Sequence, residues 1–147
     1  MGLELLIGHY SNKLQAQSNP TEWAYVNVKY SKVGDKVELK QWYQHKGEKD
    51  PYLRVLLEYE ESDKCLRMWG KNLYTGRNTC PQIFRFTGKW WEGGTEGVCI
   101  LDSMKFVTTV RFNGSQYQSR DSGYNVDTGE HVFGKHHDKG FFMFERV

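Results

Sequence analysis

Apolar and polar side chains alternate with a period of two residues from about Pro20 to the end of the chain, and this pattern restricts the fold more than any other feature. It is clearest in residues 24–30, 37–44 and 52–60. Successive side chains of a β-strand point to opposite faces, so a period of two predicts strands with one face buried. Aromatic residues favour strands, and they make up 15% of the chain.

Short turns separate the alternating segments, and pairs such as Gly93-Gly94 and Asn113-Gly114 mark them. These connections are too short for a crossover helix, so we expect antiparallel hairpins. About nine or ten such strands predict a single all-β domain over residues 1–147, either a barrel or a sandwich. The predicted strands are 24–30, 37–44, 52–60, 64–69, 82–91, 97–103, 105–112, 115–121, 129–134 and 140–146.

Polar side chains on both faces of several strands favour a barrel over a sandwich. Tyr117, Ser119 and Asp121, for example, share one face of their strand. A sandwich needs one apolar face on each strand, whereas the lumen of a barrel of this size can mix polar and apolar groups around a small ligand. The sequence is equally compatible with the alternative that these polar faces contact solvent.

One helix is predicted, from Leu3 to about Gln17, before the alternation begins. Its apolar residues recur at steps of three and four, which places them on one stripe of a helix. Asn19-Pro20 would end it. The stripe consists of Leu3, Leu6, Ile7, Tyr10 and Leu14.

Charge and motifs exclude several classes of function. The net charge of +2 is too small to indicate a nucleic-acid partner, although Phe84-Arg85-Phe86 and Lys89-Trp90-Trp91 interleave aromatic and basic residues. The chain contains no phosphate-binding glycine loop and no GxSxG or HExxH motif. It also has no apolar run of about 18 residues and no basic secretory leader, so we expect neither a membrane span nor secretion.

The three cysteines are odd in number and form no CxxC pair, so we expect neither a disulfide framework nor a zinc site. Cys65, Cys80 and Cys99 are predicted to be buried structural thiols, because no nucleophile signature pairs any of them with a histidine. This cysteine usage favours a reducing compartment, and a cytoplasmic protein is expected.

Three histidines lie near the C-terminus: His131, His136 and His137. Their proximity in sequence raises the possibility of a metal site. No cysteine or carboxylate has the spacing that would complete a closed site, so no metal is predicted.

Five blocks of sequence, in order, resemble the T-type phycobiliprotein lyases, the CpcT/CpeT family. They extend from residue 10 to residue 146, nearly the whole chain. Each block is weak alone, and their order is what makes the resemblance specific. The blocks are Tyr10-Ser11-Asn12 with Gln15-Ala16 and Asn19-Pro20; Gln41-Trp42-Tyr43-Gln44 with Pro51-Tyr52; Cys80 to Cys99 through Gly88, Gly93 and Gly97; Ser119-Arg120-Asp121-Ser122-Gly123 with Val132-Phe133-Gly134; and residues 140–146.

The resemblance implies a calycin-like or lipocalin-like antiparallel β-barrel with a cavity, often dimeric. It implies a bilin lyase: an enzyme that binds a linear tetrapyrrole, phycoerythrobilin or phycocyanobilin, with the former favoured. Such a lyase attaches the bilin by a thioether bond to a cysteine of a phycobiliprotein β subunit, of phycoerythrin or phycocyanin. The bilin is the substrate, and no metal or cofactor is implied.

The resemblance also implies which residues form the site. Tyr52 and Asp121 are the candidate catalytic residues: Tyr52 as a wall or hydrogen-bond donor, and Asp121 at the pyrrole nitrogens, where a carboxylate would stabilise the protonated bilin as an electrophile. An arginine could bind a propionate in a bidentate manner. For the cysteines, transient attachment of the bilin is the alternative to a structural role. The other candidate bilin-binding residues are Tyr43, Arg54, Arg67, Trp69, Cys80, Arg85, Trp91 and Cys99.

Several positions depart from the family pattern. Leu53 stands where the family has an arginine, unless a one-residue shift restores it as Arg54, and Gln44 and Asn125 replace aspartates. The chain is also shorter than full-length members, as expected of a cyanophage-encoded copy. Fewer charges around the cavity favour binding over transfer. The alternative functions are therefore a bilin carrier without efficient transfer and a calycin-like barrel for another apolar ligand.

Overall fold

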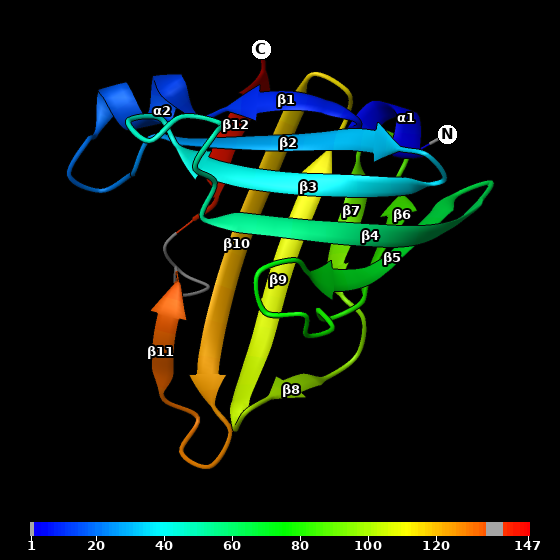
Figure 1. Ribbon diagram of the computed structural model, residues 1–147, viewed down its shortest axis with the longest axis vertical. Helices are drawn as coiled ribbons and strands as arrows, with labels where there is room; N and C mark the ends of the chain where they lie inside the picture. The colour runs from blue at the N-terminus through cyan, green and yellow to red at the C-terminus, as the bar shows by residue number, and fades with distance from the viewer. Residues whose placement is uncertain (1, 135–139) are drawn as a thin grey trace.

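The computed structural model describes residues 2–134 and 140–147, and its strands close into an antiparallel barrel (Figure 1). The predicted all-β, calycin-like barrel with a short N-terminal helix is therefore confirmed. The elements are α1 (Gly2–Leu6), β1 (Gly8–Ser11), α2 (Lys13–Ser18), β2 (Val26–Val33), β3 (Lys36–Tyr43), β4 (Leu53–Ser62), β5 (Cys65–Asn72), β6 (Gln82–Phe86), β7 (Trp91–Thr95), β8 (Cys99–Leu101), β9 (Met104–Phe112), β10 (Gln116–Asn125), β11 (His131–Gly134) and β12 (Phe142–Arg146).

Ten of the strands form the ring, in the order β10-β12-β1-β2-β3-β4-β5-β6-β7-β9, and the pairing of β9 with β10 closes it. That pairing is an unbroken antiparallel ladder from Tyr117 opposite Phe112 to Asn125 opposite Met104. Closure leaves no free edge among the ten strands at the closed end, where each has a partner on both sides.

Strands β9 and β10 are longer than the barrel needs and carry two further strands below it (Figure 1). The C-terminal half of β9 pairs with β7, while its N-terminal half pairs with β8. Similarly, the N-terminal half of β10 pairs with β12 and its C-terminal half with β11. The order β11-β10-β9-β8 thus makes a four-stranded extension that shares its two central strands with the barrel.

The core fills the barrel end opposite the extension. Helix α1 covers this end, with Leu3 and Leu6 buried among the core side chains, and the Cα of Gly2 lies so close to the indole of Trp91 that any side chain there would collide with it. Inward-facing aromatic rings fill much of the rest of this end. The largest fully buried apolar side chains are Tyr10, Phe84, Phe112, Leu6, Leu66, Val28 and Val37.

The single helix predicted from Leu3 to Gln17 is wrong in its middle, because residues 8–11 form β1. This short strand pairs with β2 on one side and β12 on the other, so it is needed to close the ring. Gly8 has φ +150°, and a Cβ there would lie 2.0 Å from the Arg146 guanidinium. The side chain of Tyr10, on β1, is buried, and that of Leu14, on α2, is exposed.

Neither helix, within residues 2–134 and 140–147, has the length and apolar character needed to cross a bilayer.

The strand predicted over residues 82–91 is two strands, β6 and β7, joined by a turn in which the amide of Thr87 donates to the carbonyl of Trp90. The predicted turn at Gly93-Gly94 is instead part of β7. A Cβ at either glycine would lie 1.8 Å from a carbonyl oxygen of the neighbouring strand. These glycines allow close strand approach, which a sequence cannot distinguish from a turn.

Asn12 joins the start of α2 to the beginning of β2. Its side chain is completely buried; its Nδ2 donates to the carbonyl of Ala24 at 2.7 Å, and its Oδ1 accepts from the amide of Val26 at 2.7 Å. A buried side chain that satisfies two main-chain groups is stabilising chiefly because those groups would otherwise be unpaired.

We expect Asn12→Ala to lower the free energy of unfolding by about 1–3 kcal/mol, since it leaves a buried amide and a buried carbonyl without partners. Urea unfolding followed by circular dichroism measures the change. Ser11→Ala is the matched control, because Ser11 accepts only an exposed hydrogen bond from Lys13. Equal stabilities of the two variants would contradict this role.

Candidate functional site

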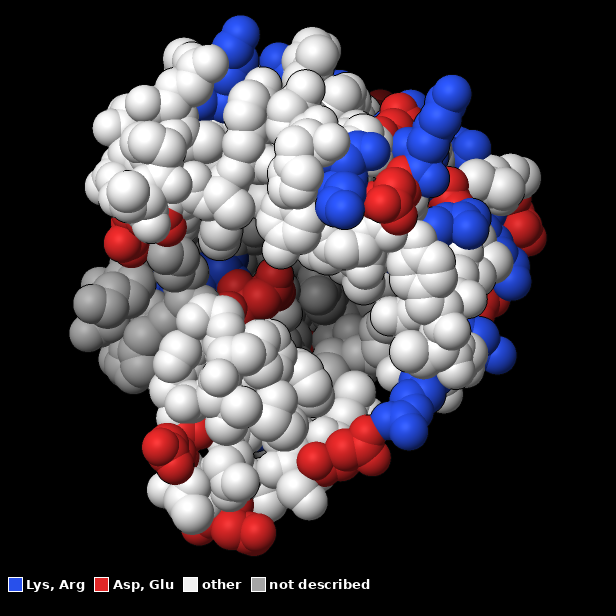
Figure 2. Space-filling view, turned by 60° about the vertical axis from the view of Figure 1, so that its left-hand side comes forward, with Lys and Arg blue, Asp and Glu red and all other residues white. Residues whose placement is uncertain are grey.

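A cavity of about 1180 Å³ opens where the barrel meets the extension. It exceeds the range of roughly 300–1,000 Å³ that is usual for ligand sites. Figure 2 shows the surface hollowed on this side, with an acidic side chain visible inside. Most of its wall is apolar, and the strands β3, β4, β5, β9 and β10 contribute it. The main apolar lining residues are Leu39, Leu53, Val55, Leu57, Met68, Phe106 and Val110.

The cavity exists because the ring opens at this end. Core side chains and α1 fill the other end, whereas here β9 and β10 run on into the extension. Phe106 and Thr108 of β9 and Asp121 of β10, in the part of the ladder beyond the filled core, therefore line the cavity. The loop between β5 and β6 and the short strand β8 border the opening.

A row of polar groups crosses this apolar wall along β10. Tyr117, Ser119 and Asp121 all line the cavity, which confirms the prediction that they share one face. The hydroxyls of Tyr117 and Tyr30 are 2.9 Å apart and share a hydrogen bond. Burial raises the pKa of both phenols, so both are protonated at neutral pH.

Asp121 is the acidic group within the cavity. Thr108 lies opposite it in the β9–β10 ladder and donates a hydrogen bond from Oγ1 to Asp121 Oδ1 at 2.7 Å. The carboxyl has surface open to the cavity, yet protein surrounds it. Desolvation raises the pKa of Asp121, and the bond from Thr108 partly opposes that shift. A carboxylate in this position favours a ligand that brings N–H donors or positive charge.

Tyr52, predicted as a wall residue or hydrogen-bond donor, lines the opening of the cavity. Its hydroxyl donates to Gln41 Oε1 at 3.0 Å, and its ring stacks on Tyr43 with 4.6 Å between centroids. Tyr43 stacks in turn on His45. Desolvation raises the pKa of Tyr52, with smaller contributions from Tyr43 and Asp121. The opening is thus bordered by a short aromatic stack.

The three predicted arginines lie outside the cavity. Arg54 pairs with Glu38 at 2.7 Å, and Arg67 pairs with Glu96 at 2.8 Å. Arg85 borders a shallow depression formed by β6, β7 and β9. The reason is strand alternation. On β4, Leu53 and Val55 face inward, so Arg54 between them points outward. On β6, Phe84 faces inward, so Arg85 next to it points outward. For β4 and β6 the polar face contacts solvent, while for β10 it lines the cavity.

The two predicted tryptophans also lie elsewhere. Trp91 is buried in the core, stacked near Phe112, and does not reach the cavity. Trp69 is on the outer face of β5, where the Arg67 guanidinium lies 5.0 Å from its ring centroid.

Two basic residues that the sequence analysis did not single out line the cavity: Lys71 and Arg77. They lie at the end of β5 and in the loop after it. No motif marks them, and alternation alone would place Lys71 on the outer face with Arg67 and Trp69. Only the loop's return toward β5, through a bridge between Lys71 and Asn78, puts the two on the cavity.

The cysteine prediction is wrong for two of the three thiols, because Cys80 and Cys99 form a disulfide. The strand order β6-β7-β9-β8 brings them together: Cys80 precedes β6 and lines the cavity, and Cys99 begins β8. In this form neither sulfur is a thiol that could hold a bilin, and the cysteine count no longer argues for a reducing compartment. Cys65 is a free, half-buried thiol.

Within residues 2–134 and 140–147, no group of three histidine, cysteine or acidic side chains is placed to hold a metal ion. His131 is on β11, with its ring 5.5 Å from that of Tyr124. His136 and His137 lie outside the described residues.

Replacing Asp121 by asparagine is expected to stabilise the protein at neutral pH, because the amide avoids desolvation of the carboxylate and still accepts from Thr108. The carboxyl of Asp121 has a higher pKa in the folded state than in the unfolded state. It therefore costs no stability below its unfolded-state pKa, and it lowers the free energy of unfolding as the pH rises through its folded-state pKa. The variant's gain should therefore be largest at about pH 7 and vanish at about pH 3. Urea titrations measure it, with Asp127→Asn in an exposed turn as control. A variant less stable than the unmodified protein at neutral pH would contradict this.

The double variant Cys80→Ser, Cys99→Ser should lose about 3 kcal/mol of unfolding free energy, since the bond closes a loop with a sequence separation of 19. Urea unfolding measures the loss, and Cys65→Ser is the control. Thiol titration of the denatured, unreduced protein should find one reactive thiol; three would show that the bond does not form.

Comparison with known proteins bears on this site. No family model and no curated protein sequence matches the chain. Among solved structures, the T-type phycobiliprotein lyase CpeT from Prochlorococcus phage P-HM1 superposes with a TM-score of 0.75 and 26% identity, covering 99% of this chain and 94% of that one.

The CRL protein of Arabidopsis superposes with a TM-score of 0.76 over 98% of this chain and 94% of that one. At 12% identity, this second match shows the fold alone. The phage match, together with the five sequence blocks in order, confirms that the chain resembles the T-type phycobiliprotein lyases, including a phage-encoded CpeT, over nearly its whole length.

Proposed function

We propose that the protein is a bilin lyase, which binds a linear tetrapyrrole in the cavity and attaches it to a cysteine of a phycobiliprotein β subunit. The single observation that carries the proposal is the acidic group of Asp121 inside a large, mainly apolar cavity. The similarity to a phage phycobiliprotein lyase supports the substrate class. Phycoerythrobilin is the favoured substrate, with phycocyanobilin as the other candidate.

The cavity suits the chemistry of a bilin. A bilin is a flat conjugated strip, and the apolar walls of β4, β5 and β9 can hold its faces. Its pyrrole N–H groups can donate to the carboxylate of Asp121, which within the described part of the chain accepts a hydrogen bond from the Thr108 hydroxyl alone. A carboxylate at these nitrogens stabilises the protonated bilin, which is the better electrophile. The stack of Tyr43 on Tyr52 would cover the end of the strip at the opening.

The transfer step needs no nucleophile from this chain. The acceptor's thiol adds to the ethylidene group of the bilin: its sulfur forms the new bond to carbon, its proton ends on the bilin, and no group leaves. The acceptor must therefore reach the opening. Val98 and Ile100, exposed beside it around β8, offer an apolar surface for that contact or for a homodimer in the cytoplasm.

The alternative is a bilin carrier that does not transfer its ligand. A specific observation favours it: Arg54, Arg67 and Arg85 all lie outside the cavity, so the charges expected to orient the bilin for transfer are not at those positions.

The purified protein is expected to red-shift and sharpen the absorption of phycoerythrobilin or phycocyanobilin. Adding an acceptor β subunit, followed by a denaturing gel with zinc fluorescence, separates the two functions. A fluorescent acceptor band indicates a lyase, whereas a shifted spectrum without a band indicates a carrier. No spectral shift with either pigment would contradict both.

Asp121→Asn should raise the bilin Kd by about tenfold or more and shift the bound spectrum to shorter wavelength, because a charge-assisted hydrogen bond becomes a neutral one. Tyr52→Phe should have a smaller effect in the same direction. Absorbance titration measures both. Asp127→Asn makes the same chemical change outside the cavity and should bind as the unmodified protein does. Unchanged spectra in both site variants would show that the bilin does not contact these residues.

A further inference from the structure

We infer that Lys71 and Arg77 form a carboxylate-binding subsite at the cavity rim, which binds the propionates of the bilin and so sets its orientation. The inference rests on the proposed function, because it names the part of that ligand that these two residues bind. It assigns to the loop after β5 the role that the sequence analysis had given to Arg54, Arg67 and Arg85.

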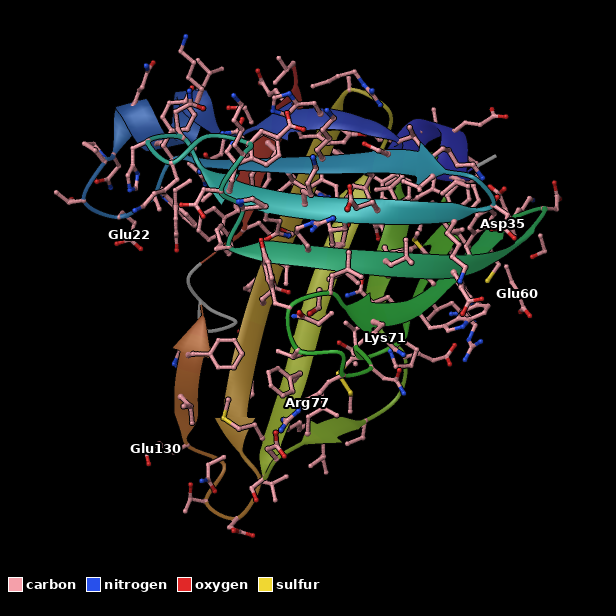
Figure 3. All side chains as sticks on the ribbon, in the orientation of Figure 1. Glu22, Asp35, Glu60, Lys71, Arg77 and Glu130 are labelled. Carbon is pink, nitrogen blue, oxygen red and sulfur yellow. A yellow bond between two sulfur atoms is a disulfide. The ribbon has the colours of Figure 1, made fainter. Side chains whose placement is uncertain are left out.

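The charged residues that line the cavity fall into two groups. Asp121 lies on the inner face of β10, while Lys71, Arg77 and Asp102 lie around the loop after β5 and the start of β9. Figure 3 shows the labelled Lys71 and Arg77 side chains beside this loop. The cavity therefore has an acidic group on one wall and a pair of basic groups at its border.

The backbone of the loop holds the two basic residues close together. Lys71 forms a β-bridge with Asn78, and the amide of Asn72 donates to the carbonyl of Arg77 at 2.9 Å. The amide of Gly76 donates back to the carbonyl of Asn72 at 2.8 Å. Both side chains thus leave one compact turn, and both line the same cavity.

Three connections hold this loop against the rest of the structure. The disulfide of Cys80 joins its end to β8, and the hydroxyl of Tyr74 donates to the carbonyl of Pro51 at 2.6 Å. Arg77 Nη1 donates to a carboxylate oxygen of Asp102 in the β8–β9 turn. A loop fixed at both ends and at its tip keeps its basic residues in place before a ligand arrives, which lowers the entropy cost of binding.

The pair retains capacity for a second carboxylate. The ion pair of Arg77 and Asp102 is largely exposed, so water weakens it, and it uses one of the five N–H donors of the guanidinium. Lys71 forms no ion pair with any residue of the described ranges 2–134 and 140–147. Two positive charges face one negative charge here, and this excess attracts an anion.

The two groups together specify an orientation. A bilin has N–H donors along the inner edge of the strip and two propionates on its outer edge. With the N–H groups at Asp121, the propionates extend toward the rim, where Lys71 and Arg77 lie. The reverse orientation would place carboxylates beside the carboxylate of Asp121 and is disfavoured by repulsion.

The experiment compares phycocyanobilin with its dimethyl ester, which keeps the conjugated strip and removes both negative charges. The unmodified protein should bind the acid about tenfold more tightly than the ester, in absorbance titrations at low salt, and this preference should shrink with added salt. In the double variant Lys71→Met, Arg77→Gln the preference should disappear, because the affinity for the free acid of the bilin falls while the Kd for the ester stays unchanged. Lys13→Met on α2 and Arg54→Gln on the outer face of β4 are matched controls that should keep the preference.

Lys71→Met alone guards against misfolding, because the Lys71 side chain has no part in holding the loop; it should lose part of the preference with an unchanged circular dichroism spectrum. Equal affinity of the unmodified protein for acid and ester would overturn the subsite while leaving the proposed function intact. So would a double variant that keeps the preference, or an Arg54→Gln control that loses it. Failure to bind either pigment would overturn the proposed function and the subsite with it.

Discussion

The ladder between β9 and β10 is the interaction on which the rest of the structure depends. Its upper part closes the ring of strands and places Phe112 and Tyr117 opposite each other in the core. Its lower part runs past the ring and carries β8 and β11 on its two edges. Because one continuous ladder serves both parts, the position of the cavity wall is set by the same register that seals the core. The same register also places Thr108 opposite Asp121.

The site contains a carboxyl group, that of Asp121, whose charged form is disfavoured by burial and partly stabilised by a hydrogen bond from Thr108. Protein surrounds the carboxyl of Asp121, and among residues 2–134 and 140–147 its carboxylate accepts a hydrogen bond from Thr108 alone. Such a group lowers stability at neutral pH, which is a common property of binding sites that keep polar groups ready for a ligand. The rim differs, since its charges are exposed and the disulfide of Cys80 and Cys99 supplies the rigidity there.

Under the proposed function, the difference between a lyase and a carrier is one of ligand orientation rather than of affinity. Apolar walls can hold a bilin in several positions, and transfer requires its reactive carbon to face the incoming thiol. Charges at two separate places are the simplest way to select one position, because each end of the ligand then has a single favourable partner. The cavity has charges at two such places, Asp121 on one wall and the pair of Lys71 and Arg77 at the border, and the proposed subsite uses both.

Local pattern alone was enough for much of the fold and part of the site. The period of two specified antiparallel strands, and it placed Tyr117 and Asp121 on one face of β10, which the structure shows lining the cavity. Tyr52 and Asp121, predicted through the resemblance of their sequence blocks to a known family, both line the cavity. These features are local, since each depends on residues that are neighbours or next-but-one neighbours along the chain.

Tertiary structure decided what depends on distant contacts. Alternation reveals two faces of a strand but not which one is inside, so Arg54, Arg67 and Arg85 were assigned to the cavity and lie outside it. Residues 8–11 have a helical pattern yet form β1, because the ring needs a strand between β2 and β12. The disulfide depends on the pairing order β6-β7-β9-β8, and the basic rim depends on the return of the loop after β5 toward that strand. Both arise from how separate segments pack, which no pattern along the chain marks.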